Sequence, residues 1–85
     1  MTVTKTTPQA VSAAIHRAGF NVVPLSRPGV HVRKSFRGAY VGVCTDTSHR
    51  GDVIMADRVR AALTDAGYVI DGDDVSFYVT GRVSA

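Results

Sequence analysis

Four basic side chains within eleven residues form the best candidate for chemistry in this chain. Arginine and lysine pair with phosphate oxygens, and a basic β-hairpin can enter a groove or follow a nucleic-acid backbone. We therefore predict that this segment docks on an acidic partner such as DNA. The alternative is a solvated edge strand whose charges prevent aggregation. With a neighbouring histidine and tyrosine, the candidate binding residues are Arg27, His31, Arg33, Lys34, Arg37 and Tyr40.

Metal binding and nucleophilic catalysis have weaker support. Cys44, Asp46 and His49 are close in sequence, but the Cys-x4-His spacing lacks the paired ligands of a zinc site. We expect Cys44 to be buried in a strand, where a thiol packs inertly instead of ionising. The chain has no glutamate and no recognisable acid–base pair. We therefore expect no enzyme, metal, cofactor or small-molecule substrate.

Charge is distributed unevenly along the chain. Residues 1–50 carry seven Lys and Arg against one Asp, a net +6, whereas residues 51–85 carry three Arg against six Asp, a net −3. Asp71, Asp73 and Asp74 cluster at one turn, without the ligand order of a calcium loop. Such asymmetry favours an acidic partner. It is equally explained by two halves of one fold, or two subunits, that neutralise each other.

Composition indicates one domain over residues 1–85. The hydrophobic content of 45% is ordinary for a globular protein. No apolar run approaches the ~20 residues that span a bilayer, so we expect no membrane segment. The first residues lack the apolar stretch of a signal peptide, and one cysteine agrees with a reducing compartment. A cytoplasmic location is therefore expected.

An eleven-residue unit occurs twice, at 13–23 and 61–71. Each copy has the pattern of a helix end, a glycine stop (Gly19 or Gly67), an aromatic residue and a strand. We expect helices over about 8–18, capped by Thr7, and about 52–66. Alternation and turn residues predict strands over 21–23, 30–36, 39–45, 68–70 and 75–80, with turns at 37–38 and 71–72. The strand over 39–45 is apolar on both faces and is therefore expected in the centre of the sheet.

These elements predict an α+β fold. We expect a two-layer sandwich with two helices on one face of a mainly antiparallel sheet of about five strands. It would be built from two helix–hairpin (αββ) pseudo-repeats, about 8–36 and 52–80, joined by strand 39–45. The other sheet face, with Tyr40, Tyr78 and Phe36, would stay uncovered. An alternative function is therefore a protein–protein interaction module that binds a host protein or forms a homodimer through this face.

The segment over 59–70, followed by a hairpin that ends at residues 78–82, resembles short uncharacterised proteins of actinobacteria and their phages. The abundance of Val, Ala and Gly, and of Arg over Lys, is in keeping with such a GC-rich source. The resemblance implies a small phage-type accessory protein that binds DNA or a host protein and does not catalyse a reaction.

Overall fold

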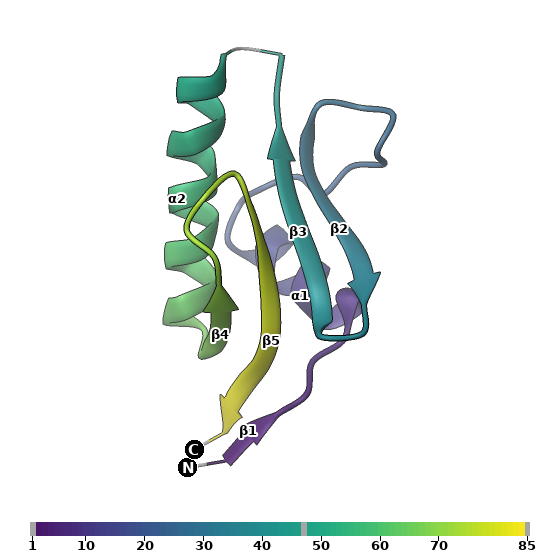
Figure 1. Ribbon diagram of the computed structural model, residues 1–85, viewed down its shortest axis with the longest axis vertical. Helices are drawn as coiled ribbons and strands as arrows, with labels where there is room; N and C mark the ends of the chain where they lie inside the picture. The colour runs from purple at the N-terminus through teal and green to yellow at the C-terminus, as the bar shows by residue number, and fades with distance from the viewer. Residues whose placement is uncertain (1, 47, 85) are drawn as a thin grey trace.

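The chain forms two helices and five strands in a computed structural model that describes residues 2–46 and 48–84. Figure 1 shows these elements coloured from purple to yellow along the chain. The predicted α+β class, with two helices and a mostly antiparallel sheet, is confirmed. The elements are β1 Thr2–Thr4, α1 Pro8–Arg17, β2 Gly29–Ser35, β3 Gly38–Cys44, α2 His49–Asp65, β4 Tyr68–Asp71 and β5 Ser76–Ser84.

The five strands make one curled sheet in which β5 has three partners (Figure 1). Tyr78 of β5 pairs with Tyr40 of β3 and also with Asp71 of β4, so these two strands lie on opposite edges of β5. Arg82 pairs in the same way with β1 and β4, so β1 continues the edge that β3 occupies. Because β3 lies between β2 and β5, the predicted central position of strand 39–45 is confirmed.

One hydrophobic core joins both helices to the sheet. Successive residues of a strand alternate between its two faces. Ala39, Val41 and Val43 of β3 are buried in the core, and the residues between them point away from it. We call the side of the sheet that points away from the core the outer face. Other core residues are Val11, Ile15, Val30, Val59, Leu63, Phe77 and Val79.

Both ends of α1 form as the sequence predicts. The Thr7 hydroxyl accepts a hydrogen bond from the Ala10 amide at 3.2 Å and caps the helix. Gly19 follows the helix at φ +96°, and the Phe20 amide donates to the Ile15 carbonyl at 3.2 Å. This is a glycine stop that turns the chain back on the helix. Gly67 has the same place after α2, at φ +91°.

Several predicted boundaries are wrong because side-chain caps and strand register act locally. Helix α2 begins at His49 instead of Asp52, since the Ser48 hydroxyl accepts a hydrogen bond from the Gly51 amide at 3.0 Å and caps the helix earlier. The predicted loop before it contains Thr47, which lies outside the described residues. The β2–β3 turn is residues 36–37, one position earlier than predicted, because Gly38 pairs with Ser35 and starts β3.

The strand predicted over 21–23 does not form. Val22 makes only an isolated parallel bridge to Val30, and Pro24, which has no amide hydrogen, then interrupts any ladder. The predicted turn at 71–72 is also wrong, since residues 72–75 connect β4 to β5. Strand β1 was not predicted. Its three residues are exposed, and it forms because β5 extends to Ser84 and offers them an edge.

Candidate functional site

A row of four side chains crosses the outer face from one strand to the next. Arg33 of β2 pairs with Tyr40 of β3, and Tyr40 pairs with Tyr78 of β5. Tyr78 in turn pairs with Asp71 of β4. Directly paired residues of neighbouring strands project to the same face of a sheet. Register alone therefore brings together side chains that are up to 45 positions apart in sequence.

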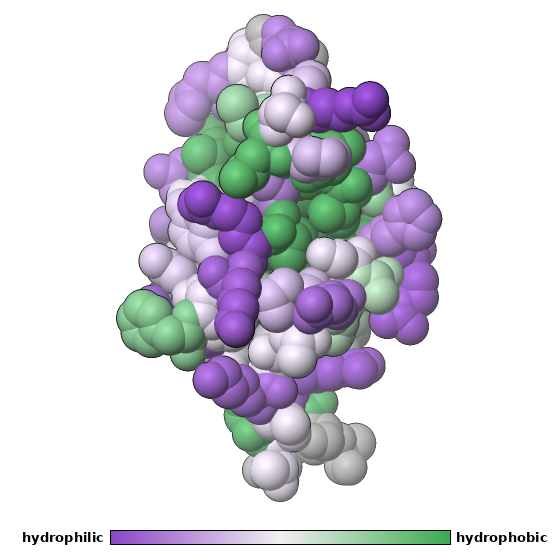
Figure 2. Space-filling model, turned by 90° about the vertical axis from the view of Figure 1, so that its right-hand side faces the viewer, coloured by the Kyte–Doolittle hydropathy of each residue, from purple (hydrophilic) through white to green (hydrophobic). Residues whose placement is uncertain are grey.

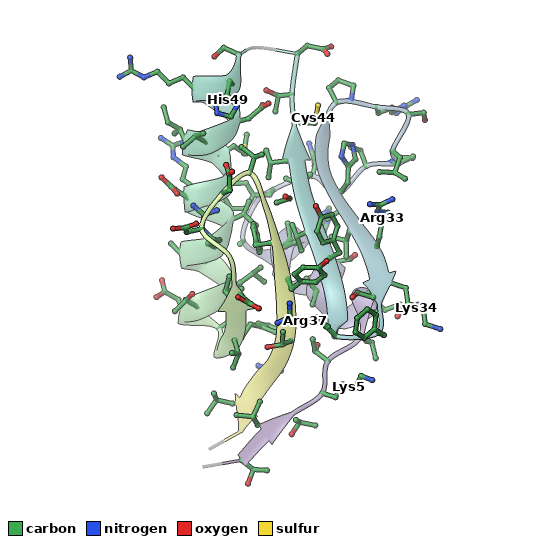
Figure 3. The ribbon with its side chains drawn as sticks, in the orientation of Figure 1. Lys5, Arg33, Lys34, Arg37, Cys44 and His49 are labelled. Carbon is green, nitrogen blue, oxygen red and sulfur yellow. The ribbon has the colours of Figure 1, made fainter. Side chains whose placement is uncertain are left out.

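Arginine side chains contact both tyrosines of this row. The Tyr40 and Tyr78 ring centroids are 5.0 Å apart, with the rings edge to face at 63°. The Arg33 guanidinium lies 5.4 Å from the Tyr40 centroid, and that of Arg37 lies 4.6 Å from the Tyr78 centroid. Arg37 also forms an ion pair with Asp71. In Figure 3, Arg33 extends from β2 while Arg37 reaches across to β5. The result is a surface of alternating guanidinium groups and aromatic rings.

Next to this row the outer face has a recess of about 190 Å³. Its floor includes Gly42, which pairs with His31 of β2 and Ser76 of β5. Arg33 and Tyr40 line one side. The His31 Nε2 donates a hydrogen bond to the Arg27 carbonyl oxygen at 2.6 Å, because a carbonyl can only accept. This bond leaves Nδ1 of the same ring for a ligand.

Apolar residues complete the lining of the recess. Val43, Val75 and Leu25 contribute to its lining, and Leu25 is 62% exposed. Figure 2 views the molecule from the side of β2 and shows hydrophobic surface, in green, surrounded by hydrophilic side chains, in purple. The recess is therefore lined mainly by apolar residues, with Arg33 and His31 at its border.

The structure brings some of the six predicted binding residues together and separates others. Arg33, Arg37 and Tyr40 meet on the outer face, and His31 lies in the neighbouring row. Arg27 is exposed in the loop before β2 and contributes its carbonyl to His31.

Lys34, the sixth predicted residue, belongs to the other side of β2. It pairs with the buried Ala39, and its neighbours include Lys5 and Pro8 beside the start of α1. The six-residue binding set stays a prediction, and within it alternation along β2 sends Arg33 and Lys34 to opposite faces of the sheet. Figure 3 shows both side chains extending from β2.

Tyr78 belongs to the site although the sequence placed it only on the uncovered sheet face. Its position on the uncovered face was predictable, because it alternates along the strand with Phe77 and Val79, which are buried. Its contact with Tyr40 depends on the β3–β5 register, which the sequence does not reveal.

Cys44 is exposed at the end of β3, so the prediction of a buried cysteine is wrong. The alternation that buries Val43 turns the next residue to the outer side, where it borders the recess. His49 stands in the first turn of α2 (Figure 3). Over residues 2–46 and 48–84 no group of three or more His, Cys, Asp or Glu side chains could hold a metal ion.

Asp52 connects the start of α2 to the end of β3. Its carboxylate accepts hydrogen bonds from the Thr45 hydroxyl and from the Thr45 amide, the latter at 2.8 Å. These bonds favour the charged form and lower the pKa of Asp52 below its usual value. The carboxylate also lies in the first helical turn, where negative charge is favourable. Its position is explained by this structural role.

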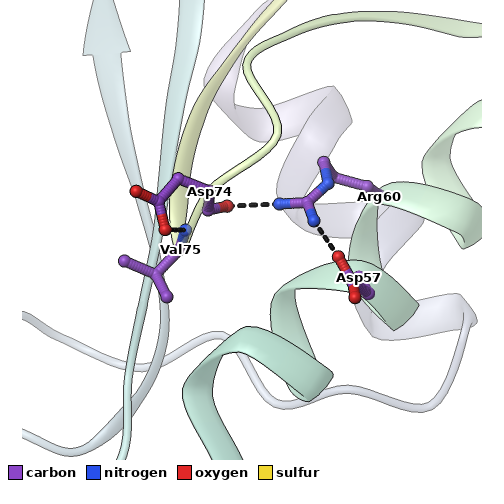
Figure 4. Close-up of polar contacts among 4 residues, drawn as sticks. All are labelled: Asp57, Arg60, Asp74 and Val75. Carbon is purple, nitrogen blue, oxygen red and sulfur yellow. Dashed lines mark hydrogen bonds and ion pairs between the residues drawn. The ribbon is translucent and has the colours of Figure 1, made fainter. Parts of the chain in front are cut away.

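The acidic residues before β5 likewise have structural partners. Figure 4 shows the Arg60 guanidinium donating to the Asp74 carbonyl oxygen and to the Asp57 carboxylate. The Asp74 carboxylate accepts a hydrogen bond from the Val75 amide at 2.7 Å. Arg60 thus fastens the β4–β5 loop to α2. Asp71 is paired with Arg37, so structural contacts explain the positions of Asp71 and Asp74 in the acidic cluster.

Comparison with known proteins gives no relative: the chain matches no protein-family model, no curated protein and no solved structure. Neither helix of the described chain is long and apolar enough to cross a membrane. The functional argument therefore depends on the site itself.

Proposed function

We propose that this chain is a small non-enzymatic binding protein whose outer sheet face docks on DNA. The observation that supports this proposal is the stacking of Arg33 on Tyr40 and of Arg37 on Tyr78. Guanidinium groups pair with phosphates, and both guanidinium planes and aromatic rings stack on bases. The rings hold the two guanidiniums against the sheet, which reduces the entropy lost when they engage a phosphate.

The proposal includes the finer architecture expected from the sequence. Two αββ pseudo-repeats in a two-layer sandwich would cover one sheet face with helices and leave the other free. The chain order supports this, since α1 precedes the β2–β3 hairpin and α2 precedes the β4–β5 hairpin. The pseudo-repeat boundaries would shift, because strand 38–44 belongs to the first hairpin. A cytoplasmic location and a phage-type accessory role stay predictions.

Salt dependence gives the proposal a quantitative form. If Arg27 and Arg33 each neutralise one phosphate while Arg37 is held by Asp71, log K should fall with log salt concentration at a slope of about −1.4 to −1.8. Each phosphate contact accounts for about 0.7 to 0.9 of this slope, for single strands and duplexes respectively.

The test is a fluorescence-anisotropy titration with labelled single-stranded and duplex DNA at low salt. Arg33→Ala should weaken binding and reduce the salt slope by about 1. Arg58→Ala is the matched control, because it removes the same charge from an exposed position on α2. Equal effects of the two substitutions would mean that only net charge matters, and absence of any binding would refute the proposal.

A protein–protein module is the second candidate function. It is favoured by Phe36, which is 90% exposed at the β2–β3 turn. An exposed aromatic side chain at a turn is a natural anchor for a partner or a second copy of the chain. Sedimentation analysis of the wild type and of Phe36→Ser tests the homodimer. A concentration-dependent dimer that the substitution abolishes would support this candidate, and a monomer in both would exclude self-association through Phe36.

A further inference from the structure

We infer that the recess over Gly42 receives one unstacked base of a single-stranded nucleic acid. This inference rests on the proposed function, because the phosphate contacts must hold the strand against the same face. It goes further by assigning a binding position and by selecting single strands over duplexes.

Gly42 has no evident structural reason to be glycine. Its backbone is not in the left-handed region, and an added Cβ would meet nothing within 4 Å in the described part of the chain. Gly38 and Gly81 differ, because a Cβ at either position would lie closer than 3.0 Å to a backbone oxygen of a neighbouring strand. Glycine inside a strand weakens it, and it often marks a place where a ligand approaches the backbone. At Gly42 the missing side chain makes space.

The size of the recess fits a single ring. Pockets for drug-sized ligands are usually about 300 Å³ or larger, whereas an apolar cavity of about 150 Å³ holds benzene. At about 190 Å³ the recess is suited to one small heterocycle with its exocyclic groups. Its polar groups also fit a base edge. Ser76 brings a hydroxyl that donates and accepts, and His31 brings Nδ1.

Charge favours a base attached to a phosphate backbone over an apolar peptide side chain. Arg33 lines the recess, and Arg27 stands in the loop that also carries Leu25. A base in the recess would place its flanking phosphates within reach of these cations, while Tyr40 and Tyr78 offer stacking surfaces for the next bases. The carboxylate in the row, Asp71, is already paired with Arg37. Bases of a duplex must be unpaired and unstacked before one can be inserted, so the recess favours a single strand.

The decisive variant is Gly42→Val, which fills the recess with a residue that strands favour. Its partner control is Thr80→Val, which adds apolar character to a half-buried position of β5 outside the recess lining. A thermal melt of each variant shows whether it folds as the wild type does. Binding is measured with a labelled oligothymidylate, the same oligomer with abasic sites, and a duplex of equal length.

We expect Gly42→Val to weaken binding of the oligothymidylate by about 5-fold to 100-fold, the range seen when one stacked base contact is lost. The salt slope and the duplex affinity should not change, because the phosphate contacts stay intact. The abasic oligomer should bind wild type and Gly42→Val equally. Thr80→Val should behave as the wild type.

The outcomes separate this inference from the proposed function. If Gly42→Val binds the oligothymidylate as tightly as the wild type while Arg33→Ala binds it less tightly, the base site is refuted and the basic face survives. If wild-type protein binds none of the three probes at low salt, the base site and the DNA-binding face are both refuted. A protein partner is then the remaining candidate ligand of the recess.

Discussion

Two glycines of the same strand should respond oppositely to the addition of one methyl group. Gly38 starts β3 at φ +128°, and a Cβ there would overlap the carbonyl oxygen of Val79 on β5. Gly42 lies four residues further along, where a Cβ would meet open space above the recess. Gly38→Ala and Gly42→Ala therefore make the same chemical change in two different environments.

The expected magnitudes follow from these environments. At Gly38, a side chain in a left-handed conformation costs about 1–3 kcal/mol, and relieving the overlap costs about 1–3 kcal/mol more. A loss of about 2–6 kcal/mol lowers the melting temperature of a domain of this size by about 8 °C or more. At Gly42, alanine should stabilise the strand by about 0.5–1 kcal/mol, a rise of about 2–8 °C.

Urea unfolding followed by circular dichroism measures both free energies, and thermal melts give an independent check. Both variants are compared with wild-type protein at the same concentration, because self-association would raise the apparent stability. A Gly42→Ala variant that is destabilised by more than about 1 kcal/mol would refute the reasoning. The space above Gly42 would then be filled, and the outer face would not contain an open recess.

Three further substitutions test the polar contacts. Arg60→Ala should lower the free energy of unfolding by about 1–2 kcal/mol through its lost bonds to the β4–β5 loop, while the control Arg58→Ala leaves it unchanged in the same urea titration. Asp52→Asn should lower the free energy of unfolding at neutral pH. Because the pKa of Asp52 is lowered in the folded state, the difference from wild type should shrink as pH falls below about 4, as pH-dependent melts can show. Asp71→Asn should cost less than about 1 kcal/mol, since the ion pair is exposed, and should tighten DNA binding by releasing Arg37.

Local chemistry made parts of the fold predictable. The ends of α1 depend on Thr7 and Gly19, and both act through bonds to residues three to five positions away. The same holds for the buried stripe of Val11 and Ile15, which follows from helical periodicity. Such features depend on short sequence separations, so the sequence is enough to place them.

The candidate site depends on longer separations. Arg37 and Asp71 are 34 positions apart, and their ion pair exists only because β4 and β3 flank β5 in one particular register. A shift of one residue would turn Tyr78 to the core. The basic character of the hairpin and the alternation of Arg33 with Lys34 could be predicted, but the contact of Arg33 with the tyrosine row required the register to be known. Strand β1 was missed for the same reason, since only the extended end of β5 gives it a partner.

The fold also changes the meaning of the charge asymmetry. Arg37 from the basic half pairs with Asp71 from the acidic half, so part of the asymmetry is neutralised within the molecule. Arg60 is occupied by Asp57 and the β4–β5 loop. Arg33 takes part in neither of the two ion pairs found in residues 2–46 and 48–84 and lies over the half-buried ring of Tyr40, on a strand whose charges also discourage edge-to-edge aggregation. These two roles are compatible, because charges that repel another strand attract a phosphate backbone. The electrostatic argument for an acidic partner therefore depends on β2 and its flanking turns, and not on the net charge of the first fifty residues.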